Sequence, residues 1–304
     1  MYNLELVENF CAICENNKNV KKIYPKNLPK NIYQINYEGR KNPDKFHYEM
    51  VRCLNCNLLF ASEVYKISTI IKLYENSEFN YNDEINGLKK TYFNCIKDLK
   101  LNNKNLNNLL DVGCGNGFLL EEAKKHGFKN VYGSEISKDA IDQANIEIKK
   151  NIEQGSFESS NFKNEFFDII FFAMVIEHFE DPNIFIKKAY KLLKPGGYLV
   201  GVTHNEGHFL SKILKNKHPI INDEHVCVFD KQTLRLIFKK HNLEVIKINS
   251  LRNYYSLSYW IKMFPFPNFI KKFLFLLFKL LKIDRMNIGI KAGNIFVISQ
   301  KKIK

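Results

Sequence analysis

Four cysteines near the start of the chain have the spacing of metal ligands. Cys11 and Cys14 form one Cys-x-x-Cys pair, and Cys53 and Cys56 form a second, with residues 15–52 between them. Four thiolates presented from two turns suit tetrahedral zinc, and a site closed by four protein ligands is structural. The other three of the seven cysteines stand alone, which favours a reducing compartment over a disulfide framework. The pattern predicts one structural zinc ion; four unrelated buried cysteines are the alternative.

The stretch DVGCGNG, residues 111–117, is the second place where chemistry is indicated. Gly113, Gly115 and Gly117 alternate with other residues, and Asp111 lies at the mouth of the loop. A dinucleotide loop would read G-x-G-x-x-G and a P-loop would continue into Gly-Lys-Ser/Thr, and neither pattern occurs here. Because a carboxylate at the mouth disfavours a pyrophosphate, a ligand with a cationic end and no phosphate fits better. S-adenosylmethionine is such a ligand.

Strands and helices must position these residues. Before residue 105, two segments have helical spacing of apolar residues, at 62–76 and 85–101. After it, strand-like and helix-like segments alternate, and the apolar run 165–175 is typical of a strand covered on both faces. This alternation predicts an α/β fold with a doubly wound parallel sheet, which binds ligands beyond the carboxyl ends of its strands.

Four ordered motifs resemble those of class I S-adenosylmethionine-dependent methyltransferases. They are DVGCGNG at 111–117, GSEIS at 133–137, FDIIFFAMVIEHFEDP at 167–182 and LLKPGGYLVGV at 192–202. The resemblance covers roughly residues 105–300 and implies a Rossmann-like methyltransferase sheet. It also implies that the loop of Asp111, Gly113, Gly115 and Gly117 holds the cofactor and that Glu135 accepts hydrogen bonds from its ribose.

Two further cofactor contacts are expected after the third strand. Many relatives have an acid there that meets the adenine amino group, whereas this chain has Ser156. Ser156 can still form a hydrogen bond, and the ring of Phe157 could pack on adenine. For Phe157 a place in the core is an equal alternative.

The segment RCLNCNLLF, residues 52–60, resembles the N-terminal zinc ribbon of one branch of these methyltransferases. Asn57 replaces the glycine that usually follows the second pair, and asparagine tolerates the left-handed conformation. This branch is associated with sugar, surface-glycan and natural-product biosynthesis. The predicted organisation is a zinc ribbon over 1–62, a helical linker over 63–104 and a methyltransferase domain over 105–304.

Histidines are the natural bases if the methyl acceptor is a hydroxyl, because their pKa lies near neutrality. His178 follows the fourth predicted strand, at the edge where ligands bind. The pair Glu224-His225 resembles a Glu-His pair of zinc-ribbon sugar C-methyltransferases, but Asn222 occupies the place of their tyrosine. This departure favours methylation of oxygen over carbon. His225 and His178 are therefore the candidate bases with Glu224 beside them, and His204 is a third.

The positive charge of the chain is concentrated near its C-terminal end. The net charge is +14, and residues 239–304 contain fourteen Lys or Arg against two acids, Glu244 and Asp284. Within this region, residues 269–283 predict a helix whose four lysines fall within an arc of about 100° on an otherwise apolar surface. Such a surface is covered by the protein itself or by a second subunit of a homodimer, or else it lies in a membrane interface.

Taken together, the motifs predict methyl transfer to a small-molecule acceptor, a hydroxyl of a sugar or surface-glycan precursor. Because neither a signal peptide nor a run of about 18 apolar residues is visible, a cytoplasmic protein is expected, with peripheral contact at the inner membrane face as an alternative. A tRNA or rRNA methyltransferase that uses the basic region as a phosphate track is the second reading. A non-catalytic binding module is the third, and the intact loop at 111–117 counts against it.

Overall fold

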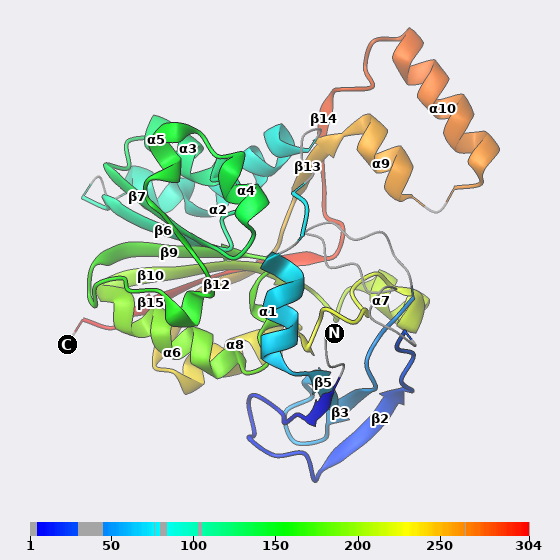
Figure 1. The fold of residues 1–304 in the computed structure, drawn as a ribbon. Helices are drawn as coiled ribbons and strands as arrows, with labels where there is room; N and C mark the ends of the chain where they lie inside the picture. Colours follow the sequence, from blue (N-terminus) through cyan, green and yellow to red (C-terminus); the bar gives the residue numbers. More distant parts are fainter. Residues whose placement is uncertain are drawn as a thin grey trace.

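The structure, a computed structural model, describes residues 5–29, 45–75, 77–79, 84–102, 105–264 and 266–303. Its centre is a seven-stranded sheet with the order β12-β15-β10-β9-β6-β7-β8 (Figure 1). In chain order these strands are β6 (Asn108–Val112), β7 (Asn130–Glu135), β8 (Ile152–Gln154), β9 (Phe167–Ala173), β10 (Leu193–His204), β12 (Leu243–Ser250) and β15 (Asn294–Lys301).

The five strands from β10 to β8 are parallel, which agrees with the predicted doubly wound α/β sheet. β15 is a correction, because it runs antiparallel to both β10 and β12. The end of β12 and the start of β15 pair with each other, Ser250 opposite Ile295. The chain therefore re-enters the sheet at the same end at which β12 left it, and β15 runs antiparallel to its neighbours as a result.

Helices cover both faces of this sheet (Figure 1). The helices α2 (Ile85–Asn102) and α3 (Phe118–Lys125) lie on one face, and α6 (Pro182–Leu192) and α8 (Lys231–Lys240) lie on the other. Each face has its own apolar core, as expected for a sheet buried on both sides. Between β7 and β8 the chain forms two short helices, α4 (Lys138–Asp142) and α5 (Ile146–Lys149), because Asn145 caps the second with its side chain.

The cysteine-containing segment folds against a smaller four-stranded sheet. The order of that sheet is β11-β4-β3-β2, from strands β2 (Val20–Tyr24), β3 (Met50–Cys53), β4 (Leu59–Ala61) and β11 (Cys227–Val228). β1 (Leu6–Glu8) pairs with β5 (Glu63–Tyr65), so the segment expected to be helical from residue 62 begins as a strand, and α1 spans only Ile67–Glu75. The strand β11 comes from far along the chain and lies beside the candidate base His225.

A projecting arm joins β12 to β15. It consists of β13 (Asn253–Ser256), α9 (Leu257–Met263), α10 (Asn268–Leu280) and β14 (Asn287–Ile290), and α10 lies at its outer end (Figure 1). No residue of α10 is buried, so the described part of the chain leaves much of the apolar surface of this helix exposed. Among the described residues, no helix is both long and apolar enough to cross a membrane.

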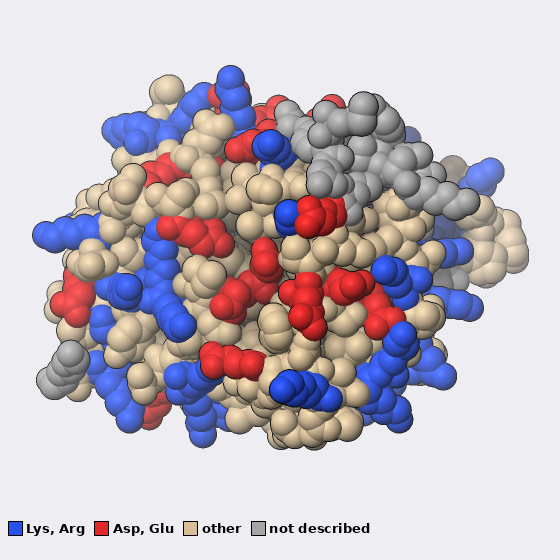
Figure 2. Space-filling model, turned by 60° about the horizontal axis from the view of Figure 1, so that its bottom comes forward, with Lys and Arg blue, Asp and Glu red and all other residues tan. Residues whose placement is uncertain are grey.

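Charge is unevenly distributed over the surface. On the face shown in Figure 2, acidic side chains gather near the middle, and lysine and arginine side chains lie mostly around the edges. This face therefore presents no continuous basic track, although the net charge of the chain is +14.

Candidate active site

The glycine loop connects β6 to the start of α3. Gly113 and Gly115 have φ values of +69° and +56°, in the left-handed region that favours glycine. A Cβ atom at Gly113 would lie 2.7 Å from Cγ2 of Val175, and one at Gly115 would lie 2.7 Å from Cε2 of Phe79. The loop is therefore conformationally restricted, and Val175 and Phe79 pack closely against it. Its backbone lies at the carboxyl edge of the sheet.

Glu135 ends the neighbouring strand β7 and faces this loop. Its carboxylate accepts hydrogen bonds from the backbone N–H groups of Gly115 at 2.8 Å, Ile136 at 2.8 Å and Ser137 at 2.9 Å. Burial raises the pKa of Glu135, and the three N–H groups oppose that shift. Asp111 is buried at the end of β6, and burial, followed by the nearby Glu135, raises its pKa. The structure thus brings Asp111, the glycines and Glu135 together.

Ser156 and Phe157 follow β8, the strand next to Glu135. The N–H of Gly155 donates to the carbonyl of Glu135 at 2.8 Å, so the start of this segment is close to the acid. The hydroxyl of Ser156 accepts a hydrogen bond from the N–H of Ser159 and so caps a short turn. Phe157 is 3% exposed, and its ring centroid lies 5.4 Å from that of Phe185. This is a core position, which was the alternative to packing on adenine. Its adenine contact stays a prediction.

Three histidines meet beyond the carboxyl ends of β9 and β10. His178 follows β9, His204 ends β10, and His225 precedes β11. The ring of His225 lies 4.8 Å from that of His178 and 4.9 Å from that of His204. Val175, which packs against Gly113, opens the short turn that ends at His178. The histidine cluster is therefore adjacent to the glycine loop.

Hydrogen bonds fix which nitrogen of two histidines can accept a proton. The hydroxyl of Tyr74 donates to Oε2 of Glu224 at 2.9 Å and lies 2.9 Å from Nδ1 of His178. Since the hydroxyl has a single proton, Nδ1 of His178 must donate to it, and Nε2 is left as the acceptor. Nδ1 of His225 lies 2.8 Å from the carbonyl oxygen of Ile220 and donates to it, so Nε2 is again the acceptor.

Tyr74 is a functional residue that the sequence did not reveal. It lies in α1, within a segment that was interpreted only as a helical linker, and no motif includes it. Burial, followed by the charge of Glu224, raises the pKa of the Tyr74 hydroxyl, so it remains protonated and can donate. Burial lowers the pKa of His178 to about 3, and that of His204 also lies well below its usual value. Both imidazoles are neutral at pH 7.

Glu177 lies directly under this cluster. Its side chain is buried, and burial raises its pKa to about 7. Ligand atoms of Glu177, His178 and His225 lie within 4.8 Å of one another, which is close enough to share a cation. The side chains of Glu177, His178 and His225 can therefore act either as proton acceptors or as ligands of a cation.

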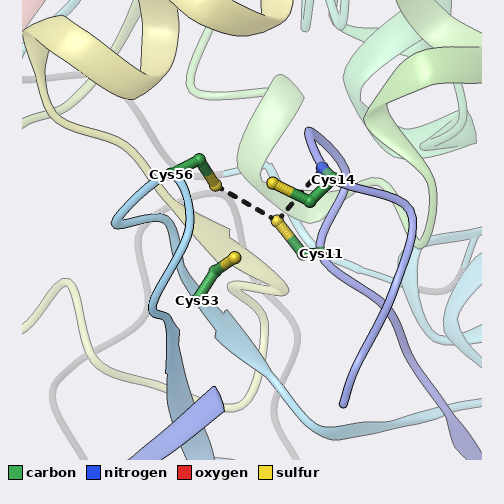
Figure 3. A group of neighbouring side chains, drawn as sticks. All are labelled: Cys11, Cys14, Cys53 and Cys56. Atoms are coloured by element: carbon green, nitrogen blue, oxygen red, sulfur yellow. Dashed lines mark hydrogen bonds between the residues drawn. The ribbon is translucent and has the colours of Figure 1, made fainter. Parts of the chain in front are cut away.

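The four cysteines predicted to bind zinc converge at one point (Figure 3). Their sulfur atoms all lie within 4.8 Å of one another, and Sγ of Cys11 is 3.4 Å from Sγ of Cys56. A tetrahedral zinc with bonds of about 2.3 Å requires sulfur atoms about 3.8 Å apart, so the donor set fits this ion. No pair is a disulfide.

The two cysteine turns have the same backbone geometry. Glu15 and Asn57, the residues after Cys14 and Cys56, both have positive φ, at 54° and 68°. The N–H of each donates to the carbonyl of the first cysteine in its pair, at 2.7 and 2.9 Å. Asn57 therefore adopts the left-handed conformation that was expected of it.

The cysteine-containing sheet is attached to the histidine cluster. β4 pairs with β11, and the N–H of Ala61 donates to the carbonyl of Val226 at 2.8 Å. The first cysteine turn is fixed as well, because Asn183 and Lys240 both donate to the carbonyl of Ala12, at 2.9 and 2.7 Å. The backbone directly after His225 is thus held by the N-terminal sheet.

Comparisons with known proteins identify a methyltransferase domain in this chain. Residues 88–248, just over half of the chain, match a family described as a methyltransferase domain. A ubiquinone biosynthesis O-methyltransferase of Pelagibacter ubique is 34% identical over 163 residues, which are 49% of this chain and 67% of that protein. A second, from Hydrogenovibrio crunogenus, is 32% identical over 140 residues, 44% of this chain and 56% of its own length. The chain thus spans between about half and two thirds of these relatives.

A solved structure agrees at the level of the fold. It is a chain from the complex between the Haloferax volcanii Trm112 methyltransferase activator and a putative methyltransferase. The two chains are 14% identical with a TM-score of 0.50, and the match covers 72% of this chain and 93% of that one. The family match includes the glycine loop and most strands of the sheet. The chain therefore belongs to the methyltransferase-domain family and is a class I S-adenosylmethionine-dependent methyltransferase.

Proposed function

We propose that this protein transfers the methyl group of S-adenosylmethionine to a hydroxyl oxygen of a small molecule. The observation that supports this most directly is the hydrogen-bonded chain from Glu224 through Tyr74 to His178, which leaves Nε2 of a neutral imidazole as the acceptor beside the glycine loop. A hydroxyl acceptor must lose a proton when its oxygen is methylated, and a neutral histidine can take it. The similar relatives are named as O-methyltransferases.

In the proposed reaction, the cofactor supplies the methyl group and the leaving group of an in-line displacement. Glu135 and the loop at Gly113 and Gly115 hold the cofactor at the carboxyl edge of the sheet. Nε2 of His178 takes the hydroxyl proton, and Tyr74 keeps the ring oriented through Nδ1. As His178 becomes charged, Glu224, whose Oε2 lies 3.9 Å from Nδ1, stabilises the imidazolium.

The electrostatics of the base favour an acidic hydroxyl. Burial lowers the pKa of His178, so its ring is a weak base, and a weak base removes a proton more readily from an acidic hydroxyl than from a less acidic one. A phenol, with a pKa of about 10 as in tyrosine, is easier for such a base to deprotonate than a sugar hydroxyl. The sugar or surface-glycan precursor expected from the zinc-ribbon resemblance has no support from the comparisons, so we favour a phenol-type acceptor.

An RNA acceptor has less support. The face in Figure 2 has acidic side chains at its centre, which disfavours a phosphate track there. The two relatives described above are named as O-methyltransferases of ubiquinone biosynthesis, not as RNA enzymes.

The test is a methyl-transfer assay with radiolabelled cofactor and three acceptor sets: dihydroxybenzoates and other catechols, nucleotide sugars, and total tRNA and rRNA. We expect label on the phenols, and digestion of the product should place it on oxygen. His178→Ala should lower this label about 10²–10⁴-fold, whereas Tyr132→Phe, a change in a ring that packs against Phe162 and Phe167, should leave it. Label found only in RNA or only on sugars would overturn the phenol assignment, and label that is undiminished in His178→Ala would overturn the role of the base.

A further inference from the structure

The arm between β12 and β15 has a fixed base. At that base, the N–H of Tyr254 in β13 donates to the hydroxyl of Thr91 in α2 at 2.8 Å. A Cβ at Gly87 would lie 2.1 Å from the carbonyl oxygen of Tyr254, so α2 and β13 are in direct backbone contact. The indole of Trp260 in α9 is buried and donates to the carbonyl of Ile288 in β14 at 2.9 Å. α9 is thus anchored, and the anchor holds α10 away from the main sheet.

The outer helix of the arm exposes a straight apolar stripe. Phe269, Phe273, Leu276 and Leu280 are 72%, 63%, 71% and 78% exposed. Their spacing of four, three and four residues places them on one face of the helix, within about 60°. The half-buried residues Ile270, Leu274 and Leu277 lie on another face of the helix. Within the described part of the chain, the stripe is therefore left uncovered.

The connection between α9 and α10 adds to this apolar surface. Met263, Phe264 and Phe266 are each more than a third exposed, and the rings of Phe264 and Phe266 stack at 5.5 Å. Large apolar side chains that gather in this way on a soluble chain indicate a binding surface.

The polar border of the stripe is basic. Lys272 and Lys279 are exposed at helical positions beside it, and Lys271 lies further round and donates to the carbonyl of Lys262 at the end of α9. Across the whole connection from 251 to 293 the sequence has eight Lys or Arg residues and a single acid, Asp284. An apolar stripe bordered by lysines is the pattern of a helix in a membrane interface.

We propose that the α9–α10 arm docks on an anionic lipid bilayer, with the stripe among the acyl chains and Lys272 and Lys279 at the phosphates. Charge decides between this partner and a second copy of the chain. A two-fold dimer through the stripe would bring two lysine-bordered surfaces together, whereas lipid phosphates neutralise them. The helix has 13 residues, or about 20 Å, which is less than a hydrocarbon core of about 30 Å, so it lies in the interface plane.

The test is co-sedimentation of the full-length protein with sucrose-loaded vesicles of phosphatidylcholine alone or mixed with phosphatidylglycerol. Binding is expected to the anionic vesicles at about 10 mM ionic strength, and it should weaken at about 1 M, where the Debye length falls to about 3 Å. Lys272→Gln with Lys279→Gln should weaken partitioning roughly 30-fold, since each lysine near an anionic surface contributes roughly a fivefold change, or about 1 kcal/mol.

A second variant tests the stripe itself. Phe269→Gln, Phe273→Gln, Leu276→Gln and Leu280→Gln together should remove binding at any salt concentration. Matched controls change exposed residues elsewhere: Ile146→Gln with Ile184→Gln for the stripe, and Lys187→Gln with Lys191→Gln for the charges. Unchanged cofactor affinity establishes that each variant is folded.

Three outcomes overturn the proposal. If the wild-type protein stays in the supernatant with anionic vesicles at low salt, the arm does not bind lipid. If light scattering instead finds a dimer that the stripe variant dissociates, the occupant is a second copy of this chain. Equal binding by the wild type and the stripe variant would also refute it, because lipid contact would then arise elsewhere.

Discussion

Replacing Tyr74 with phenylalanine removes one oxygen atom and tests the proposed arrangement of the base. The Tyr74 hydroxyl donates to Glu224, whose side chain is only 6% exposed, and it accepts from Nδ1 of His178. A hydrogen bond to a charged group contributes about 1.5–3 kcal/mol. If that energy is used to orient His178 in the transition state, Tyr74→Phe should lower kcat roughly 10- to 150-fold, at about 1.4 kcal/mol per tenfold.

The assay is steady-state kinetics with the best phenol acceptor, together with calorimetry of cofactor binding. The KM of the acceptor and the cofactor affinity should change little, because Tyr74 contacts the base rather than the glycine loop. Tyr132→Phe is the matched control, since its ring packs against Phe162 and Phe167 away from the histidines. A normal kcat in Tyr74→Phe would refute the reasoning, and a parallel loss of cofactor affinity would assign Tyr74 a structural role instead.

Three further predictions concern the cofactor, the base and the metal. Glu135→Ala should cost about 1–3 kcal/mol of cofactor affinity, measured by calorimetry, and unchanged affinity would remove Glu135 from the site. Because the pKa of His178 lies near 3, the profile of kcat/KM against pH should show no loss of activity with a midpoint near pH 6.5 on the acid side. His178→Ala should slow turnover about 10²–10⁴-fold. A midpoint near pH 6.5 would point to a different base, and His225→Ala would then be the next variant. Protein purified without chelators should contain about one zinc per chain at the four cysteines, and Cys56→Ala should lose it; elemental analysis that finds none would contradict the site.

The elements that the sequence predicted correctly are those specified by local patterns. The continuous apolar run at 165–175 identified β9, and the loop at 113–117 and Glu135, taken from the family motifs, lie at the ends of β6 and β7. His178 could be placed for the same reason, since it follows a strand directly. In these cases residue type and position within a strand are enough to determine which edge of the sheet a side chain occupies.

The features that were missed depend on contacts between distant parts of the chain. The bond from Tyr74 to Glu224 joins residues 150 positions apart, and nothing in the local pattern around Tyr74 distinguishes it from any other helical aromatic residue. β11 has two residues, which is too short for a periodic signal, and it exists because β4 pairs with it. The exposure of the stripe on α10 was undecided for the same reason, since periodicity identifies an apolar face but not its partner.

These long-range contacts explain why a structural metal would matter for catalysis without touching the substrate. The first cysteine turn is fixed to α6 and α8 through Ala12, and the second leads into β4, which pairs with β11 directly after His225. An ion bonded to all four cysteines would connect the two turns across the sheet. Loss of the ion would free β4 and so loosen the backbone at His225. The tautomer of His225 depends on the position of Ile220, because Nδ1 of His225 donates to the Ile220 carbonyl. The N-terminal sheet therefore supports the backbone directly after His225, and α1, from the same N-terminal segment, supplies the Tyr74 hydroxyl that contacts His178.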